Sequence, residues 1–366
     1  MNLRTQLVDL TSKLVAIPSV SAQKCDLDRV IDFIVEHVRD LPDVQLHHTN
    51  YNDFPTLTVG FHAVRHADVV LNAHVDVVPA RDDQWQTVER DGKLYGRGTQ
   101  DMKGAAAVYM KIIHDIAAMP ADQRPNVLFQ FVTDEEIGGA NGTAKLRDEG
   151  WSANLFIAGE PTDLQICHAA KGILWVEIMQ PGVPAHGSRP WEGVNPIERL
   201  AHGLRNLLAM YPPPHEPLWR TTISANIVHG GDAGNRIPDK ASLRLDVRWT
   251  PEEGIEQVLA NIEQAFKFDS PPHATISILQ QGSSLNTAAD HAQVQRIHHA
   301  QTLTLGHEPH SFREHFGSDA RFYSEMNVPA VCWGPVGSGL HTDDEWVSID
   351  GLVDYYHAVR ALLGMR

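Results

Sequence analysis

The chain has 366 residues, of which 42% are hydrophobic, and its formal net charge at pH 7 is −16. This length exceeds the size at which a single hydrophobic core usually divides, so we expect two domains. The negative charge disfavours nucleic acid and anionic membrane surfaces as partners, because both are polyanions.

The first part of the chain alternates helical and strand patterns. Apolar residues recur at helical spacing from Leu3 to Leu14 and again from 27 to 38, which predicts two amphipathic helices. Strands are predicted at 57–61, 68–75, 126–132 and 154–159. After the Gly-rich segment LYGRGTQDMKG, a helix is expected to begin near Asp101. Near-continuous apolar strands that alternate with helices predict an open, mostly parallel sheet covered by helices.

The order of predicted elements changes after Lys171. A strand, a helix, two strands, a helix and a strand are predicted at 172–179, 195–210, 221–228, 241–249, 252–266 and 274–280. This β-α-β-β-α-β order is typical of the ferredoxin-like fold. The chain then returns to helices and to a strand at 329–334. We therefore expect one discontinuous α/β domain made of 1–173 and 285–366, with a ferredoxin-like α+β domain, 174–284, inserted in it.

Cysteine usage and hydropathy favour a cytoplasmic protein. Cys25, Cys167 and Cys332 are widely spaced and form no CxxC motif, which favours reduced thiols over disulfides or a cysteine-ligated zinc. No apolar run is long enough to span a bilayer, and the first ten residues lack the pattern of a secretory signal.

Acidic residues and histidines follow several of the predicted parallel strands. Ligands of open α/β sheets bind beyond the carboxyl ends of the strands. The side chains expected at that edge are His74, Asp76, Asp101, Glu135, Glu136, Glu160 and His341. So many carboxylates would raise one another's pKa by like-charge repulsion unless a cation neutralised them. The sequence therefore predicts a metal centre.

Two metal ions account best for these residues. The expected ligands are His74, Asp101, Glu136, Glu160 and His341. Their three carboxylates and one shared hydroxide balance two divalent ions, with Asp101 between them. Imidazole and carboxylate ligands without thiolate suit zinc, and cobalt or manganese could replace it.

Two further carboxylates are expected to support the metal ligands. Residues two apart on a strand point to the same face, so Asp76 is expected to accept the second ring N–H of His74. Adjacent side chains in an extended segment point apart, so Glu136 can hold a metal while Glu135 acts as general base. Each motif alone could be a core histidine, an acidic turn or a helix cap. A metal centre is inferred because all of these motifs occur together, each at the end of a predicted strand.

Together these motifs resemble those of a known family. HVDVVP, GRGTQDMKG, TDEEIGG, GEPT and LHTDDE have the order and spacing found in the di-zinc amidohydrolases, which include acetylornithine deacetylase, succinyl-diaminopimelate desuccinylase, aminoacylase and glutamate carboxypeptidase. The resemblance covers nearly the whole chain. It implies one zinc on His74 and Glu160, a second on Glu136 and His341, and Asp101 between them. It also implies that the inserted domain is a lid that carries a homodimer contact.

The resemblance also gives roles to three residues of the inserted domain. His186, in PGVPAHGSRPWEG, is similar to a histidine that reaches the partner subunit's active site and stabilises the tetrahedral oxyanion. Asn235 and Arg248, in HGGDAGNRIP and LDVRW, are similar to residues that contact the substrate carboxylate. Arginine suits this task because its planar guanidinium binds a carboxylate through two hydrogen bonds. Without the resemblance, Arg248 would be a solvated strand residue and His186 a loop histidine.

The expected activity is hydrolysis of the amide bond of an N-acyl amino acid or a small peptide-like substrate. GEPTDLQICHAAKG and HGGDAGNRIP are most similar to acetylornithine deacetylase, which is our first choice, whereas HFGSDARFY is similar to the desuccinylase and dipeptidase branches. A desuccinylase, a dipeptidase and a carboxypeptidase therefore stay open as alternatives. A catalytically silent metal-binding relative is a more distant one, because Glu135 is present. A nucleotide-dependent enzyme and a serine hydrolase are disfavoured because their motifs are absent from the sequence.

Overall fold

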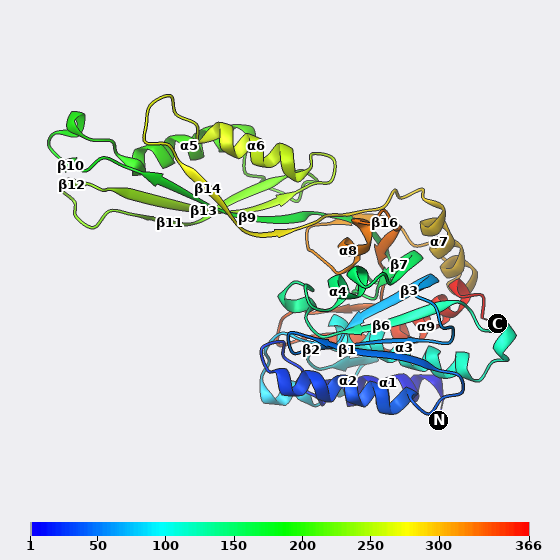
Figure 1. Cartoon of the computed structure of the whole chain (residues 1–366). Coiled ribbons are helices and arrows are strands. Elements are labelled where there is room, and N and C mark those ends of the chain that lie inside the picture. The colour runs from blue at the N-terminus through cyan, green and yellow to red at the C-terminus, as the bar shows by residue number, and fades with distance from the viewer. Residues whose placement is uncertain (1, 366) are drawn as a thin grey trace. The chain divides into compact units, whose positions relative to one another are not determined.

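The computed structural model describes residues 2–365, apart from the side chain of Cys25. Contacts between residues divide the chain into two compact units (Figure 1). Unit 1 comprises Met1–Ala169, Leu285–Arg313 and Ser318–Arg366, and unit 2 comprises Ala170–Ser284 and Glu314–Gly317. The first boundary thus lies four residues before the expected one at 173/174. The segment Glu314–Gly317 belongs to unit 2, and the Lys171 N–H donates to the Glu314 carbonyl at 3.3 Å.

The helices and strands have the following bounds. The α-helices are α1 Leu3–Val15, α2 Lys24–Val38, α3 Gly104–Ala117, α4 Thr143–Asp148, α5 Pro196–Met210, α6 Ile255–Ala265, α7 Ala292–Leu305, α8 Ala320–Ser324 and α9 Ile349–Leu362. The strands of unit 1 are β1 Gln45–Tyr51, β2 Phe54–Gly60, β3 His66–His74, β4 Val88–Arg90, β5 Lys93–Tyr95, β6 Val127–Val132, β7 Ser152–Ala158, β8 Ile166–Ala170, β15 Leu285–Asn286, β16 Ser311–Glu314, β17 Ala330–Cys332, β18 Gly337–Ser338 and β19 Trp346–Ser348. The strands of unit 2 are β9 Gly172–Pro181, β10 Ala185–His186, β11 Thr222–Gly230, β12 Arg236–Ile237, β13 Lys240–Trp249 and β14 Thr275–Gly282.

A mixed sheet with the strand order β1-β2-β6-β3-β7-β17-β8-β15 forms the centre of unit 1. Its middle strands β6, β3, β7 and β17 are parallel, whereas β1, β2 and β8 pair antiparallel at the two sides. Every residue of β6 is buried, which fits a strand covered on both faces. The largely parallel sheet predicted from the sequence is confirmed.

Helices α1, α2, α3 and α9 contribute to the core of unit 1 through their apolar faces. Leu7 and Leu14 of α1 and Ile31 and Ile34 of α2 are fully buried, and they belong to one cluster with residues of α3 and α9. The side chain of Asn2 begins α1 by accepting a hydrogen bond from the Thr5 N–H at 2.9 Å. The two amphipathic helices predicted at the start of the chain are therefore present.

Unit 2 contains an antiparallel sheet with the order β11-β13-β9-β14. In chain order the strands of this sheet and the two helices are β9, α5, β11, β13, α6 and β14, which is the β-α-β-β-α-β order expected from the sequence. The short strands β10 and β12 pair separately. Buried and more exposed residues alternate along β9 and β13. The buried face packs with residues of α5 and α6, including Leu200 and Val258. The other face of the sheet is the open face, and it carries the even-numbered side chains of β13 from Arg244 to Arg248.

Two features of the fold differ from the sequence prediction. The helix expected to begin near Asp101 begins at Gly104, because Asp101 (φ −116°, ψ 92°) and Met102 (φ −132°, ψ 40°) are not helical. The edge strand β1 was not predicted, since its sequence QLHHTNY is polar and half-exposed. Within residues 2–365, no helix has the length and apolar character needed to cross a membrane.

Candidate metal centre

The parallel strands bring the predicted ligands to one edge of the sheet. His74 is the last residue of β3, and Glu160 follows β7, which pairs with β3 on one side. Glu135 and Glu136 lie in a short turn after β6, which pairs with β3 on the other side. Because all three strands run in the same direction, their carboxyl ends meet.

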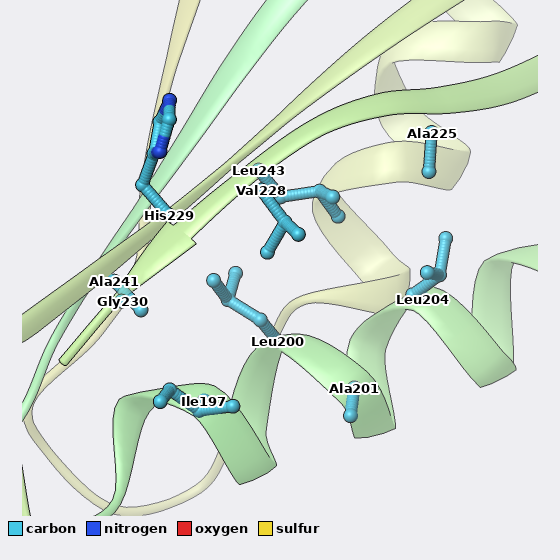
Figure 2. Close-up of a pocket in the computed structure, with 10 residues that line it drawn as sticks. All are labelled: Ile197, Leu200, Ala201, Leu204, Ala225, Val228, His229, Gly230, Ala241 and Leu243. Carbon is cyan, nitrogen blue, oxygen red and sulfur yellow. The ribbon is translucent and has the colours of Figure 1, made fainter.

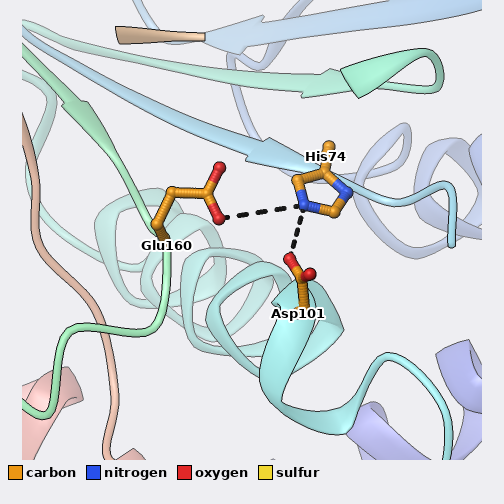
Figure 3. A group of neighbouring side chains, drawn as sticks. All are labelled: His74, Asp101 and Glu160. Carbon is orange, nitrogen blue, oxygen red and sulfur yellow. Dashed lines mark hydrogen bonds and ion pairs between the residues drawn. The ribbon is translucent and has the colours of Figure 1, made fainter. Parts of the chain in front are cut away.

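His74, Asp101 and Glu160 form the first group of ligand atoms (Figure 3). The Nε2 atom of His74 lies 2.8 Å from Asp101 Oδ1 and 4.0 Å from Glu160 Oε2. All three residues are buried, and their ligand atoms lie within 4.8 Å of one another. This spacing leaves room for one cation between the three side chains.

Asp101, Glu136 and His341 form the second group. The Nε2 atom of His341 lies 3.2 Å from Asp101 Oδ2 and 3.2 Å from Glu136 Oε2. Asp101 thus belongs to both groups and directs one oxygen towards each histidine. A carboxylate placed in this way can bridge two metal ions.

The charges at the centre fit divalent cations. Burial and the nearby charge of Glu160 raise the pKa of Glu135 well above its usual range. Burial raises the pKa of Glu160 in the same way, with a further contribution from Asp101. Hydrogen bonds to Asp101 and Glu136 raise the pKa of His341 to about 10. Burial and the close carboxylates both disfavour the charged forms of Glu135 and Glu160, and a divalent ion in each group would offset this. Because the donors are imidazole nitrogens and carboxylate oxygens, zinc fits them.

Asp76 has a different set of partners from the one expected. The Nδ1 atom of His74 lies 3.0 Å from the backbone carbonyl of Asp76 and 3.5 Å from its carboxylate, so the carbonyl is the nearer acceptor. The carboxylate instead accepts hydrogen bonds from Ser21 Oγ at 2.8 Å and from the backbone N–H groups of Glu135 at 3.3 Å and Glu136 at 3.2 Å. Asp76 therefore holds both the His74 ring and the turn with the two glutamates.

Replacing Asp76 by asparagine should affect both stability and metal binding. The neutral amide accepts hydrogen bonds more weakly than the carboxylate, and we expect unfolding free energy to fall by about 1.5–3 kcal/mol. Zinc affinity should fall by roughly 10- to 100-fold, the usual effect of losing a group that orients metal ligands. Urea unfolding and zinc titration measure these effects, with the exposed Asp122→Asn as control. If the two variants behave alike, Asp76 does not support the centre.

A buried ion pair that the sequence analysis did not identify holds the turn with Asp101. One carboxylate oxygen of Glu345 accepts hydrogen bonds from the backbone N–H groups of Gln100 at 3.0 Å and Asp101 at 3.2 Å, and the other pairs with the Arg97 guanidinium. Arg97 Nη2 also donates to the Thr342 carbonyl at 3.1 Å. The pair thus connects the turn that carries Asp101 with the segment that follows His341.

The sequence contained a signal for this pair. Arg97 and Glu345 lie in GRGTQDMKG and LHTDDE, two segments already expected to meet at the metal centre. Opposite charges in converging segments are candidates for a buried pair. Asp101 itself is not helical, and its N–H donates to the Glu345 carboxylate.

The structure separates the predicted site residues of unit 2 into two places. His186 pairs with Arg236 between β10 and β12, and the Gly187 N–H donates to the Asn235 carbonyl at 2.7 Å, so His186 and Asn235 are neighbours. Arg248 lies near the other end of β13, where it donates to Asp246 at 2.9 Å. The eight steps along β13 from residue 240 to residue 248 span roughly 26 Å. Asn235 and Arg248 of one chain therefore lie towards opposite ends of the unit 2 sheet. Their contact with a substrate carboxylate stays a prediction.

Comparison with known proteins identifies hydrolases that resemble this chain in sequence and in fold. The sequence model described as peptidase family M20/M25/M40 matches residues 70–364. A succinyl-diaminopimelate desuccinylase from Corynebacterium glutamicum is 28% identical over 356 residues, which cover 94% of this chain and 92% of that protein. An acetylornithine deacetylase from Myxococcus xanthus is 31% identical over 310 residues, or 78% of this chain and 77% of that protein. In fold, the crystal structure of aminopeptidase PepT from Bacillus cereus matches 98% of both chains with a TM-score of 0.81 at 20% identity.

Proposed function

This chain belongs to peptidase family M20/M25/M40, and from this premise we propose that it hydrolyses the amide bond of an N-acyl amino acid with two divalent metal ions, most suitably zinc. The main support for two ions is the position of Asp101. One of its carboxylate oxygens lies beside His74 and the other lies beside His341. The presence of Glu135 beside these groups supports an active hydrolase over a catalytically silent relative.

The chain's own residues have distinct tasks in this reaction. One ion would be held by His74, Asp101 and Glu160, and the other by Asp101, Glu136 and His341. When bound, such ions act as Lewis acids on the scissile carbonyl and lower the pKa of water.

Proton transfer falls to Glu135. It takes a proton from the attacking water and later delivers it to the nitrogen of the leaving amine. Burial and the charge of Glu160 raise its pKa, which favours acceptance of a proton. The hydrogen bonds from the Glu135 and Glu136 N–H groups to Asp76 keep the base and the ligand in fixed relative positions.

The specific enzyme activity depends on which acyl group is removed. Acetylornithine deacetylase is our first choice, and a desuccinylase, a dipeptidase and a carboxypeptidase are the alternatives. A role in amino-acid biosynthesis, in the cytoplasm, is part of this proposal, and the buried free thiols of Cys167 and Cys332 suit a reducing compartment.

A substrate panel tests the proposed activity. Purified protein loaded with zinc or cobalt is assayed with N-acetyl and N-succinyl amino acids and with dipeptides. We expect zinc-dependent release of a free amine from at least one N-acyl amino acid. Activity on dipeptides alone would make the protein a peptidase, and inactivity on the whole panel would contradict the proposal.

We also propose that the active protein is a homodimer formed through unit 2. His186 and Asn235 lie too far from Arg248 to share a ligand within one chain, roughly 26 Å along β13. In a dimer, His186 and Asn235 of the second copy could lie close to Arg248 of the first and contact the same substrate. In that arrangement, His186 stabilises the oxyanion formed in the partner's site.

The edge of the unit 2 sheet offers a surface for this contact. Strand β11 is an edge strand, and Val228 on it is 65% exposed. A groove of about 420 Å³ lies between β11 and α5, lined by apolar side chains such as Leu200, Leu204 and Leu243 (Figure 2). An apolar edge strand readily pairs with another strand, and a second copy of β11 would cover it.

Subunit mixing tests the exchange of His186. Mixing equal amounts of His186→Ala and Glu135→Ala proteins should restore about a quarter of wild-type activity, because half of the dimers are mixed and each has one complete site. A mixture in which Glu135→Ala also carries His186→Ala should remain inactive. If subunits exchange and no activity returns, His186 does not act across the dimer.

A further inference from the structure

Residues 17–21, which follow helix α1, lie beside the chain that leaves strand β3. The Val77 N–H donates to the Ser19 carbonyl at 3.0 Å, and the Ser19 hydroxyl donates to the Val75 carbonyl. These two contacts lie on either side of Asp76. We refer to residues 17–21 as the support segment.

Ser21 is the member of the support segment that binds the Asp76 carboxylate itself. Its hydroxyl donates to Asp76 Oδ2 at 2.8 Å, whereas the N–H groups of Glu135 and Glu136 donate from 3.3 and 3.2 Å. Ser21 and Asp76 are 5% and 0% exposed, so water does not readily replace a lost hydroxyl. Removing the hydroxyl would therefore leave a buried charged acceptor with one strong partner fewer.

Lys103 connects the support segment with the turn that carries Asp101. Its side chain is fully buried, and its Nζ atom donates to the Ile17 carbonyl at 2.8 Å and to the Leu14 carbonyl at 3.0 Å. Leu14 lies in the last turn of α1, where a positive charge is favourable. Because a buried ammonium group is costly without acceptors, these carbonyls hold Lys103 and its turn in place.

The same turn packs directly against the chain that leaves β3. Gly98, which precedes the turn, has φ +79°, and a Cβ atom on it would lie 2.7 Å from Val77 Cγ1 and 3.2 Å from Lys103 Cδ. Glycine permits both this conformation and this close approach. The two segments that meet here carry His74 and Asp101, whose Nε2 and Oδ1 atoms are 2.8 Å apart.

We propose that Ser21 and Lys103 are positioning residues of the metal centre. Through Ser21 the support segment fixes Asp76, which holds the His74 ring. Through Lys103 it fixes the turn that carries Asp101. The segment thereby sets the separation of two metal ligands, although Ser21 and Lys103 belong to neither group of ligand atoms. This inference rests on the proposed two-metal function and deepens it.

Zinc titration of purified variants tests the positioning role. Ser21→Ala and Lys103→Met should each bind zinc roughly 10- to 100-fold more weakly than wild type, because a segment that carries a ligand is held less firmly. Ser21→Thr keeps the hydroxyl and should recover most of the affinity. Thr11→Val is the control, since Thr11 is also buried and its hydroxyl donates to the Leu7 carbonyl within α1 at 2.8 Å. It should bind zinc as wild type does.

Two further measurements distinguish positioning from a general loss of stability. The absorption spectrum of cobalt-loaded protein depends on ligand geometry, so saturating cobalt should give altered visible bands in Ser21→Ala and Lys103→Met but not in Thr11→Val. Because Ser21 acts through Asp76, adding Ser21→Ala to Asp76→Asn should change zinc affinity by no more than about twofold.

The outcomes separate this inference from the proposed function. Urea unfolding of the metal-free proteins shows which variants are folded, and Lys103→Gln, which keeps a neutral donor, replaces Lys103→Met if the latter does not fold. A wild-type protein that binds no zinc would contradict the proposed function itself. If wild type binds two ions, and the folded Ser21 and Lys103 variants match Thr11→Val in zinc affinity and cobalt spectrum, the positioning role is overturned.

Discussion

Replacing Glu135 by glutamine is expected to lower kcat by roughly 10² to 10⁴, the usual contribution of a general base. Glutamine keeps the size of the side chain, and the backbone N–H of residue 135 can still donate to Asp76. Glu135 belongs to neither group of ligand atoms, so the metal content should remain close to that of wild type. Added zinc should therefore not restore the activity.

The neighbouring Glu136→Gln variant provides the matched comparison. Glu136 belongs to the second group of ligand atoms, and its Oε2 atom lies 3.2 Å from His341 Nε2. Glutamine would offer a neutral oxygen in place of the charged one. We expect one metal ion to bind more weakly and added zinc to recover part of the activity. Mass spectrometric metal analysis beside steady-state kinetics distinguishes the two variants. If Glu135→Gln loses metal and Glu136→Gln keeps it, base and ligand are exchanged.

Replacing Glu345 by glutamine should lower the free energy of unfolding by about 3–5 kcal/mol, because it leaves the buried Arg97 guanidinium without a counter-charge. It also weakens the acceptor for the backbone N–H groups of Gln100 and Asp101. The turn that carries Asp101 should loosen, and both metal ions should bind more weakly. Urea unfolding and zinc titration measure the two effects.

An exposed ion pair serves as the control. Arg81 pairs with Asp343, two residues before Glu345, and the two side chains are 54% and 62% exposed. Asp343→Asn should change stability by no more than about 1 kcal/mol. The double variant Arg97→Met with Glu345→Gln should recover part of the stability lost in Glu345→Gln, since no unpaired charge remains. Equal effects of Glu345→Gln and Asp343→Asn would contradict the role given to the buried pair.

The parts of this fold that local patterns determine could be predicted from the sequence. Apolar runs such as the one in β3, and helical periodicity such as that of α1, depend on neighbouring residues alone. The order of motifs at strand ends also identified the side chains that meet at the centre, because parallel strands bring their carboxyl ends together. His74, Asp101 and Glu160 illustrate this (Figure 3).

Features that depend on distant contacts could not be predicted in this way. The turn before α3 is one such feature, since the Asp101 N–H in it donates to Glu345, which is 244 positions away in the chain. The partners of the Asp76 carboxylate are backbone groups, which no sequence motif identifies. The separation of Asn235 from Arg248 follows from the pairing register of β9 and β13, and side-chain identity alone does not determine register.

Anomalous X-ray scattering from crystals of the zinc-loaded protein shows directly whether two metal ions share Asp101. Data collected on both sides of the zinc absorption edge locate the bound ions without assumptions about their ligands. We expect two zinc positions, one among His74, Asp101 and Glu160 and the other among Asp101, Glu136 and His341, with one Asp101 oxygen on each. A single zinc between the two histidines, or two ions that do not share Asp101, would contradict a bridging role of Asp101.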